Sequence, residues 1–295
     1  MNLYFFLYIC LIDTINSNKM KTQYFKIIFI SIALLFSNAV IYAQDFQGKA
    51  TYISKSKMEL GRWGARMSEA QKKQIAARLK NRLEKEFVLV FNKQESVFTE
   101  EEQLDAISGA TDSWGKNFAA GENYKNVKTN AQIQQQEFYG KKFLVKDKLQ
   151  KIDWTLGKES KQIGNYLCYK ATSFIPTDDL LWYSFSWSRM RSTDNQDAED
   201  EENNEPEVDV TQIEAWYTPQ IPVGHGPSEY WGLPGLILEV SAGGTTMLCS
   251  KIVINSVETI EIEAPKKGTT VTKNEYQDII QNKMAEFRNN RMRRR

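Results

Sequence analysis

The sequence predicts an α+β fold, namely a mainly antiparallel, curved β-sheet with one inserted amphipathic helix and a C-terminal helix. Most of the chain consists of short stretches in which apolar and polar residues alternate, the pattern of strands with one covered face. Turn residues separate many of these stretches, and only two stretches repeat apolar residues at helical spacing. Successive strands joined by short turns pair antiparallel, so the pattern favours this class over a parallel sheet.

The N-terminal region has the parts of a secretory signal peptide. Two lysines follow Met20, residues 27–36 form a short apolar stretch, and small residues precede Gln44. We predict that residues 1–43 are an upstream extension plus the signal peptide, with translation starting at Met20 and cleavage before Gln44. An uncleaved membrane anchor is the alternative. Export predicts a periplasmic or secreted protein of a Gram-negative bacterium, with no stable transmembrane anchor after cleavage.

The charge balance argues against a nucleic-acid partner. The chain has 38 Lys and Arg residues against 37 Asp and Glu residues, which gives a formal net charge of +1, and nucleic-acid-binding domains carry a clear basic excess. Residues 194–209 are strongly acidic and contain no aromatic residue. Such a segment cannot bury enough apolar surface to fold, so we predict a disordered acidic loop. Calcium binding there is the weaker interpretation, because EF-hand spacing is absent.

The β-rich domain is predicted over residues 44–270, and its first elements are a strand and a helix. Residues 46–58 alternate loosely and predict the first strand. Ser68 followed by Gln71 is typical of a capping box, and apolar residues then recur at about every fourth position. We therefore expect an amphipathic helix over residues 69–86, packed on the sheet. Binding to a membrane surface is the alternative for this basic helix.

Two insertions into this domain are predicted, at residues 61–86 and 101–136. The second is polar and rich in Gly, Gln and Asn, so we expect an irregular segment. Residues 138–147 and 150–156 predict a hairpin with its turn at Asp147 and the lysines beside it. The remaining strands are expected at residues 86–92, 96–100, 165–175, 180–187, 211–217, 235–241 and 245–255.

The C-terminal part predicts a tight hairpin and then a helix. Gly243 and Gly244 separate the last two strands and are typical of a two-residue turn. Within residues 271–295 a helix is expected over 273–288, and the last residues form an arginine-rich basic tail. The apolar side chains that would share one side of this helix are Tyr276, Ile280 and Phe287.

The most specific motif is a Pro- and Gly-rich segment over residues 216–237. It ends in the run Gly232, Leu233, Pro234, Gly235, Leu236 and Ile237. Upstream, Trp154 precedes a second stretch, which reads KQIGNYLCYKA over residues 161–171. Together the two segments resemble the GLPGLI family of exported bacterial proteins, in which Asn165 would commonly be a glycine. The resemblance implies an exported β-rich domain but no activity and no catalytic residues, because the family has no settled biochemical function.

Two interpretations of the connection at residues 217–235 stay open. A long Pro/Gly-rich connection is either a rigid wall of a cleft or a plug that closes the end of a curved sheet. In the first case we expect a non-enzymatic protein that binds an apolar small molecule, lipid or peptide, and envelope proteins are further candidate partners. The predicted ligand-binding residues are aromatic, namely Trp182, Trp187, Trp216, Tyr230 and Trp231.

Two other function classes remain as alternatives. Carboxylates at Glu214, Glu229 and Glu239 would supply the acid–base pair of an envelope hydrolase or peptidase-associated factor. An assembly or surface-interaction module would instead use the acidic loop and the basic tail to attract partners electrostatically.

The remaining reactive side chains predict no catalytic residue, metal or cofactor. His225 lies between two glycines, so we expect it in solvent, and no second histidine exists to complete a metal site. Ser228 lacks the glycines of a nucleophile elbow. Cys168 and Cys249 form either a disulfide or two buried thiols. Met247 shares a face with Cys249, a pair that suits Cu(I) but that core packing explains better.

Overall fold

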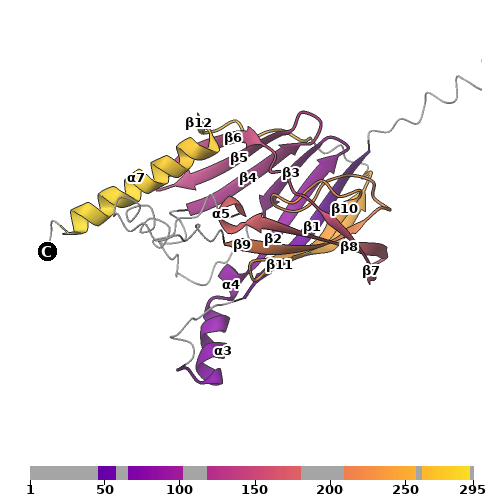
Figure 1. Cartoon of the computed structure of the whole chain (residues 1–295), viewed down its shortest axis with the longest axis horizontal. Coiled ribbons are helices and arrows are strands. Elements are labelled where there is room, and N and C mark those ends of the chain that lie inside the picture. Colours follow the sequence, from indigo (N-terminus) through magenta and orange to yellow (C-terminus); the bar gives the residue numbers. More distant parts are fainter. Residues whose placement is uncertain (1–45, 58–65, 102–117, 181–208, 257–260, 293–295) are drawn as a thin grey trace, which may run out of the picture. The chain divides into compact units, whose positions relative to one another are not determined.

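The described strands all belong to one sheet. The computed structural model describes residues 46–57, 66–101, 118–180, 209–256 and 261–292, all of which lie in the unit Phe46–Arg295. These residues form a 12-stranded sheet in the order β12-β6-β5-β4-β3-β2-β1-β11-β10-β9-β8-β7 (Figure 1). Neighbouring strands are antiparallel except β12 and β6, which are parallel. The sheet is open and curved, so the predicted α+β class is confirmed.

The first half of the chain forms one side of the sheet, and β1 joins it to the other side. In β1, Ala50 and Tyr52 are fully buried, in keeping with the period-2 pattern read from the sequence. The strands on this side are β1 (Gln47–Ser56), β2 (Glu84–Asn92), β3 (Glu95–Glu100), β4 (Phe118–Asn126), β5 (Ala131–Phe138) and β6 (Lys141–Lys148).

The second half completes the sheet and ends in a short parallel strand. The strands are β7 (Thr155–Ile163), β8 (Tyr166–Pro176), β9 (Val210–Thr218), β10 (Leu236–Ala242), β11 (Thr245–Ile254) and β12 (Thr269–Val271). The predicted hairpin between β10 and β11 is confirmed. Gly243 and Gly244 form its turn at φ values of 53° and 77°, a conformation that favours glycine.

The predicted inserted helix is shorter than expected. Helix α3 (Glu69–Arg78) begins with the expected capping box of Ser68 and Gln71. A break at Leu79 and the short α4 (Lys80–Leu83) follow, and the chain is already extended at Glu84, where β2 begins. No described side chain of α3 is buried, in contrast to the sheet-packed helix that we expected.

The C-terminal helix α7 (Lys273–Met292) covers the end of the sheet at β5 and β6. Thr272 and Glu275 cap its N-terminus reciprocally. Its buried side chains pack with β5 and β6 in one cluster, made of Phe138, Phe143, Val145, Tyr276, Ile280 and Met284. The predicted apolar side is therefore correct for Tyr276 and Ile280, whereas Phe287 is 37% exposed and lies against Tyr139, with ring centroids 5.1 Å apart.

Two sequence interpretations in the middle of the chain were wrong. Part of the supposed irregular insertion forms β4 and β5, because backbone ladder bonds and a few buried side chains such as Tyr124 suffice for a strand whose other residues are polar. The turn of the next hairpin lies at Tyr139 and Gly140, with φ values of 48° and 75°, and not at Asp147. Consequently β6 pairs with β5 and not with residues 150–156.

Several expectations concern residues outside the described ranges. The structure forms a short helix, α5 (Thr177–Leu180), where the strand over residues 180–187 was expected to begin, and its description resumes at Asp209. The signal peptide, most of the acidic loop and the end of the basic tail also lie outside the described residues. Among the described residues, no helix is long and apolar enough to cross a membrane.

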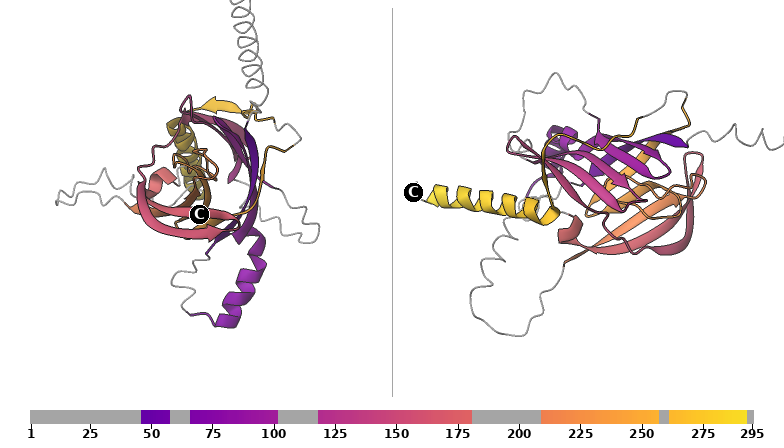
Figure 2. Two further views of the ribbon diagram at one scale, coloured as in Figure 1. Left: turned by 90° about the vertical axis from the view of Figure 1, so that its right-hand side faces the viewer. Right: turned by 90° about the horizontal axis from the view of Figure 1, so that it is seen from above.

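The apolar core is divided between clusters on different parts of the sheet. One cluster joins residues of β1, β2, β3, β8, β9, β10 and β11, Trp216 among them, to Ile221 and Val223, which come from the connection between β9 and β10. A second cluster joins β8, β9 and β10 to Leu233 of the same connection. In the left view of Figure 2 the sheet curls on itself, and this orange-brown connection lies within the curl. The connection is therefore the main partner of the inner face of the sheet.

Candidate functional site

The connection between β9 and β10, residues 219–235, is called the Pro/Gly loop below. Backbone hydrogen bonds join this loop to the start of β10: Leu236 N donates to Ile221 O at 2.9 Å, and Ile237 N donates to His225 O at 3.0 Å. Ile221, Val223 and Leu233 are 2–3% exposed. The space behind this loop is filled by the loop's own side chains, which supports the plug interpretation over a wide apolar cleft.

A buried lysine holds the middle of the Pro/Gly loop. Lys125 on β4 is 0% exposed, and its ammonium Nζ donates to three loop carbonyls: Gly226 O at 2.8 Å, Ser228 O at 2.7 Å and Tyr230 O at 3.2 Å. These three bonds use all the donor hydrogens of an ammonium group. Burial lowers the pKa of Lys125 to about 7, and the nearby carboxylate of Glu229 opposes this shift.

His225 is buried, so the expectation of a solvated loop histidine was wrong. It is 0% exposed, its Nε2 lies 3.0 Å from the backbone oxygen of Asn92, and its ring lies beside Phe91 at a centroid distance of 6.2 Å. The flanking glycines do not expose it, because the loop folds into the sheet. Burial, and secondarily the charge of Lys125, lower the pKa of His225 to about 3, while the bond to Asn92 opposes the shift.

We expect that His225 stays neutral throughout the mildly acidic range. Its folded pKa of about 3 lies below the ordinary value of 6.5, so between these pH values the unfolded chain binds the extra proton and stability falls as the pH decreases. Because the chain has one histidine, its imidazole C–H signals can be followed by NMR without ambiguity. No titration should appear between pH 8 and 5 in the folded protein, whereas urea-unfolded protein serves as the titrating control. A midpoint near 6.5 in the folded protein would contradict a buried neutral ring.

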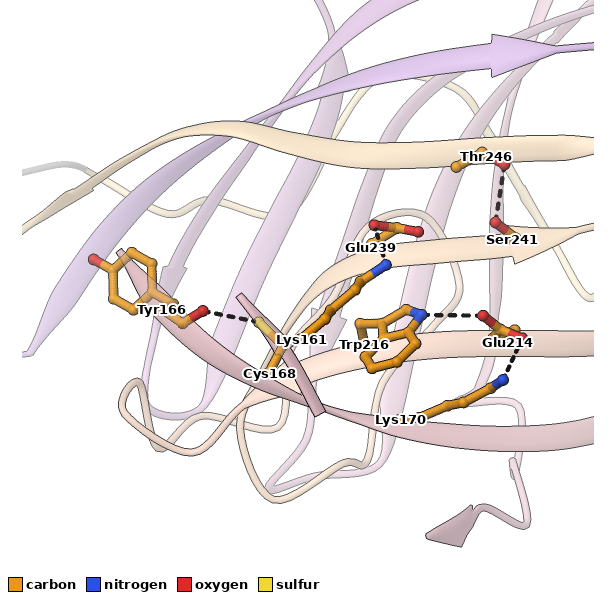
Figure 3. Close-up of polar contacts among 9 residues, drawn as sticks. All are labelled: Lys161, Tyr166, Cys168, Lys170, Glu214, Trp216, Glu239, Ser241 and Thr246. Atoms are coloured by element: carbon orange, nitrogen blue, oxygen red, sulfur yellow. Dashed lines mark hydrogen bonds and ion pairs between the residues drawn. The ribbon is translucent and has the colours of Figure 1, made fainter. Parts of the chain in front are cut away.

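Trp216 lies in a row of charged side chains on one face of β7 to β10 (Figure 3). Its indole Nε1 donates to Glu214 Oε1 at 3.1 Å, and Lys161 Nζ lies 4.2 Å from its ring centroid. Lys170 Nζ is 5.8 Å from the same ring and 3.0 Å from Glu214 Oε2. Trp216 is 8% exposed, so its ring is covered by neighbouring side chains, including these cations.

The other predicted aromatic residues lie elsewhere. Tyr230 packs against the cluster of β8, β9 and β10, on the face of β9 opposite to Trp216. Trp231 Nε1 donates to the backbone oxygen of Gln150 at 2.7 Å. Trp182 and Trp187 lie outside the described residues. Trp216 and Tyr230 thus belong to different apolar clusters, and ligand contact by any of the five aromatics stays a prediction.

The three predicted carboxylates do not form an acid–base pair. Glu239 Oε2 is 2.7 Å from Lys161 Nζ, and the hydrogen bond from Lys170 lowers the pKa of Glu214. A carboxylate whose pKa is lowered by a lysine, as that of Glu214 is, is a poor general acid and a weak base. Glu229, 6% exposed, comes from the Pro/Gly loop on the other side of the sheet. The arrangement gives no support to a carboxylate hydrolase.

Both described cysteines are free and buried, so the disulfide alternative is not formed. Cys168 lies on β8 and Cys249 on β11, with β9 and β10 between them in the sheet. Burial raises the pKa of the Cys168 thiol to about 11 and that of Cys249 to about 12. Among the described residues, no group of three His, Cys, Asp or Glu side chains is arranged to hold a metal ion.

Two cavities flank Glu229. The larger has a volume of about 310 Å³, and its lining includes Leu180, Ser228, Glu229, Tyr230, Val240 and Met247. The smaller has a volume of about 210 Å³, and its lining includes Gln132, Gln134, Asp147, Lys148, Glu229 and Lys273. The lining of the larger cavity mixes apolar side chains with hydroxyl groups, those of Thr177, Thr211 and Thr245 among them, whereas that of the smaller is mainly polar. This pair of cavities is the candidate functional site.

Sequence reasoning missed the contributions of β4 and β5 to this site. Lys125 and Gln134 fall in the stretch that we interpreted as an irregular insertion. The sequence gives little signal for this strand, because residues 132–136 read QIQQQ and three consecutive glutamines show no period of two. Nothing in the sequence distinguishes the buried Lys125 from the exposed lysines around it.

Comparisons with known proteins identify relatives of the central part of the chain. Residues 154–239 match the model of a family described as a protein of unknown function (Porph_ging). Two solved structures of PNGF-II are similar: the one in the C2 space group has 14% identity and a TM-score of 0.47, covering 80% of this chain and 32% of that chain. The one in the P21 space group has 15% identity and a TM-score of 0.45, covering 79% and 33%. The chain therefore spans about a third of the length of these chains.

No curated protein sequence matches the chain. The family match runs from Trp154 to Glu239, so it includes β7, β8, β9, the Pro/Gly loop and the start of β10. Of the smaller cavity's lining it contains Glu229 alone, and of the larger cavity's lining it contains the residues from Thr177 to Tyr230.

Proposed function

We propose that this chain is an exported protein that binds a small amphipathic molecule in the larger cavity. The observation that carries the proposal is the lining of that cavity, which combines apolar side chains such as Val240 and Met247 with several hydroxyl groups and the carboxylate of Glu229. Apolar walls with a few placed polar groups are typical of ligand sites. The volume of about 310 Å³ is at the lower end of the range for such sites, which favours a small ligand.

The wall formed by the Pro/Gly loop is held in place before any ligand arrives. Lys125 binds the carbonyls of Gly226, Ser228 and Tyr230, and the last two of these residues line the cavity. Ser228 has a φ of 49°, a backbone conformation that is sparsely populated for a residue with a side chain. A preformed wall reduces the entropy that binding would otherwise cost.

Export rests on the signal-peptide pattern before Gln44. The predicted ligand class is narrower than the lipid or peptide that the sequence suggested, because the Pro/Gly loop fills the space that a larger ligand would need.

Binding of the fluorescent apolar amine N-phenyl-1-naphthylamine tests this proposal. The wild-type chain should give a saturable rise in its fluorescence. Ala242→Phe places a ring in the larger cavity and should weaken binding at least tenfold, because the volume available to the probe falls. Leu248→Phe is the matched control: Leu248 lies on β11 and is 41% exposed, so affinity should stay within about twofold. Fluorescence that does not saturate, or equal effects of the two variants, would contradict the proposal.

A further inference from the structure

The smaller cavity contains a buried hydrogen-bond acceptor without a partner. Gln134 on β5 is 5% exposed, and its side-chain oxygen Oε1 is buried and has no hydrogen-bond partner among the described residues. Buried polar atoms are nearly always paired, so an unpaired oxygen that borders a cavity indicates that a donor from outside the chain fits there. Glu229, 6% exposed, provides a carboxylate at the lining of the same cavity.

The buried polar members of this lining offer acceptor oxygens, whereas lysines outnumber carboxylates among its exposed members. The buried polar members are Gln134 and Glu229. The exposed members are Lys148, Lys151 and one carboxylate, Asp147, whose Oδ1 accepts from the backbone N of Lys148. Lys151 is already 2.8 Å from Asp153, so Lys148 is the better partner for an incoming anion. A ligand that matches this order has donors at its inner end and a negative group at its outer end.

We propose that the smaller cavity binds a small zwitterion, with its ammonium group donating to Gln134 Oε1 and Glu229 and its carboxylate meeting Lys148. A volume of about 210 Å³ accommodates a molecule of amino-acid size. A bare metal ion or a simple amine fits less well, because the lysines of the lining repel a ligand that carries only positive charge. An apolar ligand would leave Gln134 Oε1 unpaired.

The smaller cavity shares Glu229 with the larger cavity, but ligand binding there does not depend on the function proposed above.

Three probes of equal chain length separate the two ends of the site. Titration calorimetry of the wild-type chain with 4-aminobutanoate should show saturable binding. Butylamine, which lacks the carboxylate, and butanoate, which lacks the ammonium group, should each bind at least tenfold more weakly, because each leaves one end of the site without its partner. Absence of binding by 4-aminobutanoate up to 10 mM would overturn the proposal. Equal affinity for all three probes would also overturn it, since it would indicate adventitious contact without recognition of charge.

Neighbouring positions on β5 give a matched pair of variants. Gln134→Leu keeps the approximate volume, removes the acceptor and should weaken 4-aminobutanoate binding at least tenfold. Gln135→Leu makes the same change one residue further, on the opposite face of the strand, and should change the affinity less than twofold. If both variants weaken binding equally, the assignment of Gln134 is wrong.

Two further measurements keep the test independent of folding and of the proposed function. Gln134→Leu should still bind N-phenyl-1-naphthylamine in the larger cavity, and Ala242→Phe should still bind 4-aminobutanoate. Lys148→Gln alters an exposed side chain and should reduce the preference for 4-aminobutanoate over butylamine to less than threefold. If Lys148→Gln still prefers 4-aminobutanoate over butylamine as the wild type does, Lys148 does not bind the carboxylate of the ligand. This conclusion would hold even if Gln134→Leu failed to fold.

Discussion

Replacing Gly235 with alanine is expected to destabilise the folded chain by more than about 4 kcal/mol, because the new methyl group has no space. A Cβ at this position would lie 2.2 Å from Thr218 O and 2.5 Å from Thr218 C, at the end of the neighbouring strand β9. These are backbone atoms, so they can move only if the pairing of Leu236 with Thr218 breaks. Urea unfolding followed by circular dichroism measures the effect, and a loss of soluble protein would be its extreme form.

Two other glycines of the Pro/Gly loop serve as controls. Gly224→Ala should cost less than about 1 kcal/mol, since the nearest atom to its Cβ would be Leu233 O at 3.5 Å, an ordinary contact. Gly232→Ala has space, with its nearest neighbour at 3.9 Å, but its φ of 91° should cost about 1–3 kcal/mol in backbone strain. If Gly235→Ala is no worse than Gly224→Ala, β9 and β10 do not approach as closely as the structure shows.

Replacing Lys125 with methionine is expected to cost about 3–5 kcal/mol of unfolding free energy. Methionine matches the length and shape of the lysine stem but donates no hydrogen bond. The carbonyls of Gly226, Ser228 and Tyr230 would lose their shared donor, and the buried Glu229 would lose the nearby positive charge. Lys128→Met, on the exposed turn after β4, is the control and should stay within about 0.5 kcal/mol of the wild type.

The cost of Lys125→Met should also depend on pH. The pKa of Lys125 is about 7 in the folded chain against an ordinary value of 10.5, so between these values the unfolded chain binds more protons than the folded one. Stability from this group therefore rises as the pH increases from 7 toward 10.5, and it is lowest below pH 7. The difference between wild type and Lys125→Met should accordingly be larger at pH 9 than at pH 6. A difference that shrinks as the pH rises would show that Lys125 is not held in a desolvated site.

The strands that the sequence located best have apolar side chains on one covered face. β1, β9, β10 and β11 were predicted to within a few residues, because their burial follows the period of two that the residues themselves display. The capping box at Ser68 was equally readable, since its bonds join residues only three positions apart. Local bonding and local periodicity are properties of the sequence alone.

The failures lie where the partner of a residue is distant in the sequence. β5 was interpreted as irregular because Gln134 and Gln136 are polar, yet both are buried on a sheet whose inner face meets the Pro/Gly loop. His225 was expected in solvent because glycines flank it, and it is buried because its partner, Asn92, lies 133 residues away. No pattern within a short window records such contacts.

The sequence by itself determined the fold class, the hairpin at Gly243 and Gly244, and the importance of the Gly-Leu-Pro-Gly-Leu-Ile run as a rigid turn into a strand. The tertiary structure decided what that turn is for. It places Gly235 against Thr218, anchors the loop through Lys125 and thereby sets Glu229 between an apolar and a polar cavity. The physical reason is that strand propensity and turn geometry are local, whereas a cavity exists only where segments far apart in the chain fail to fill the space between them.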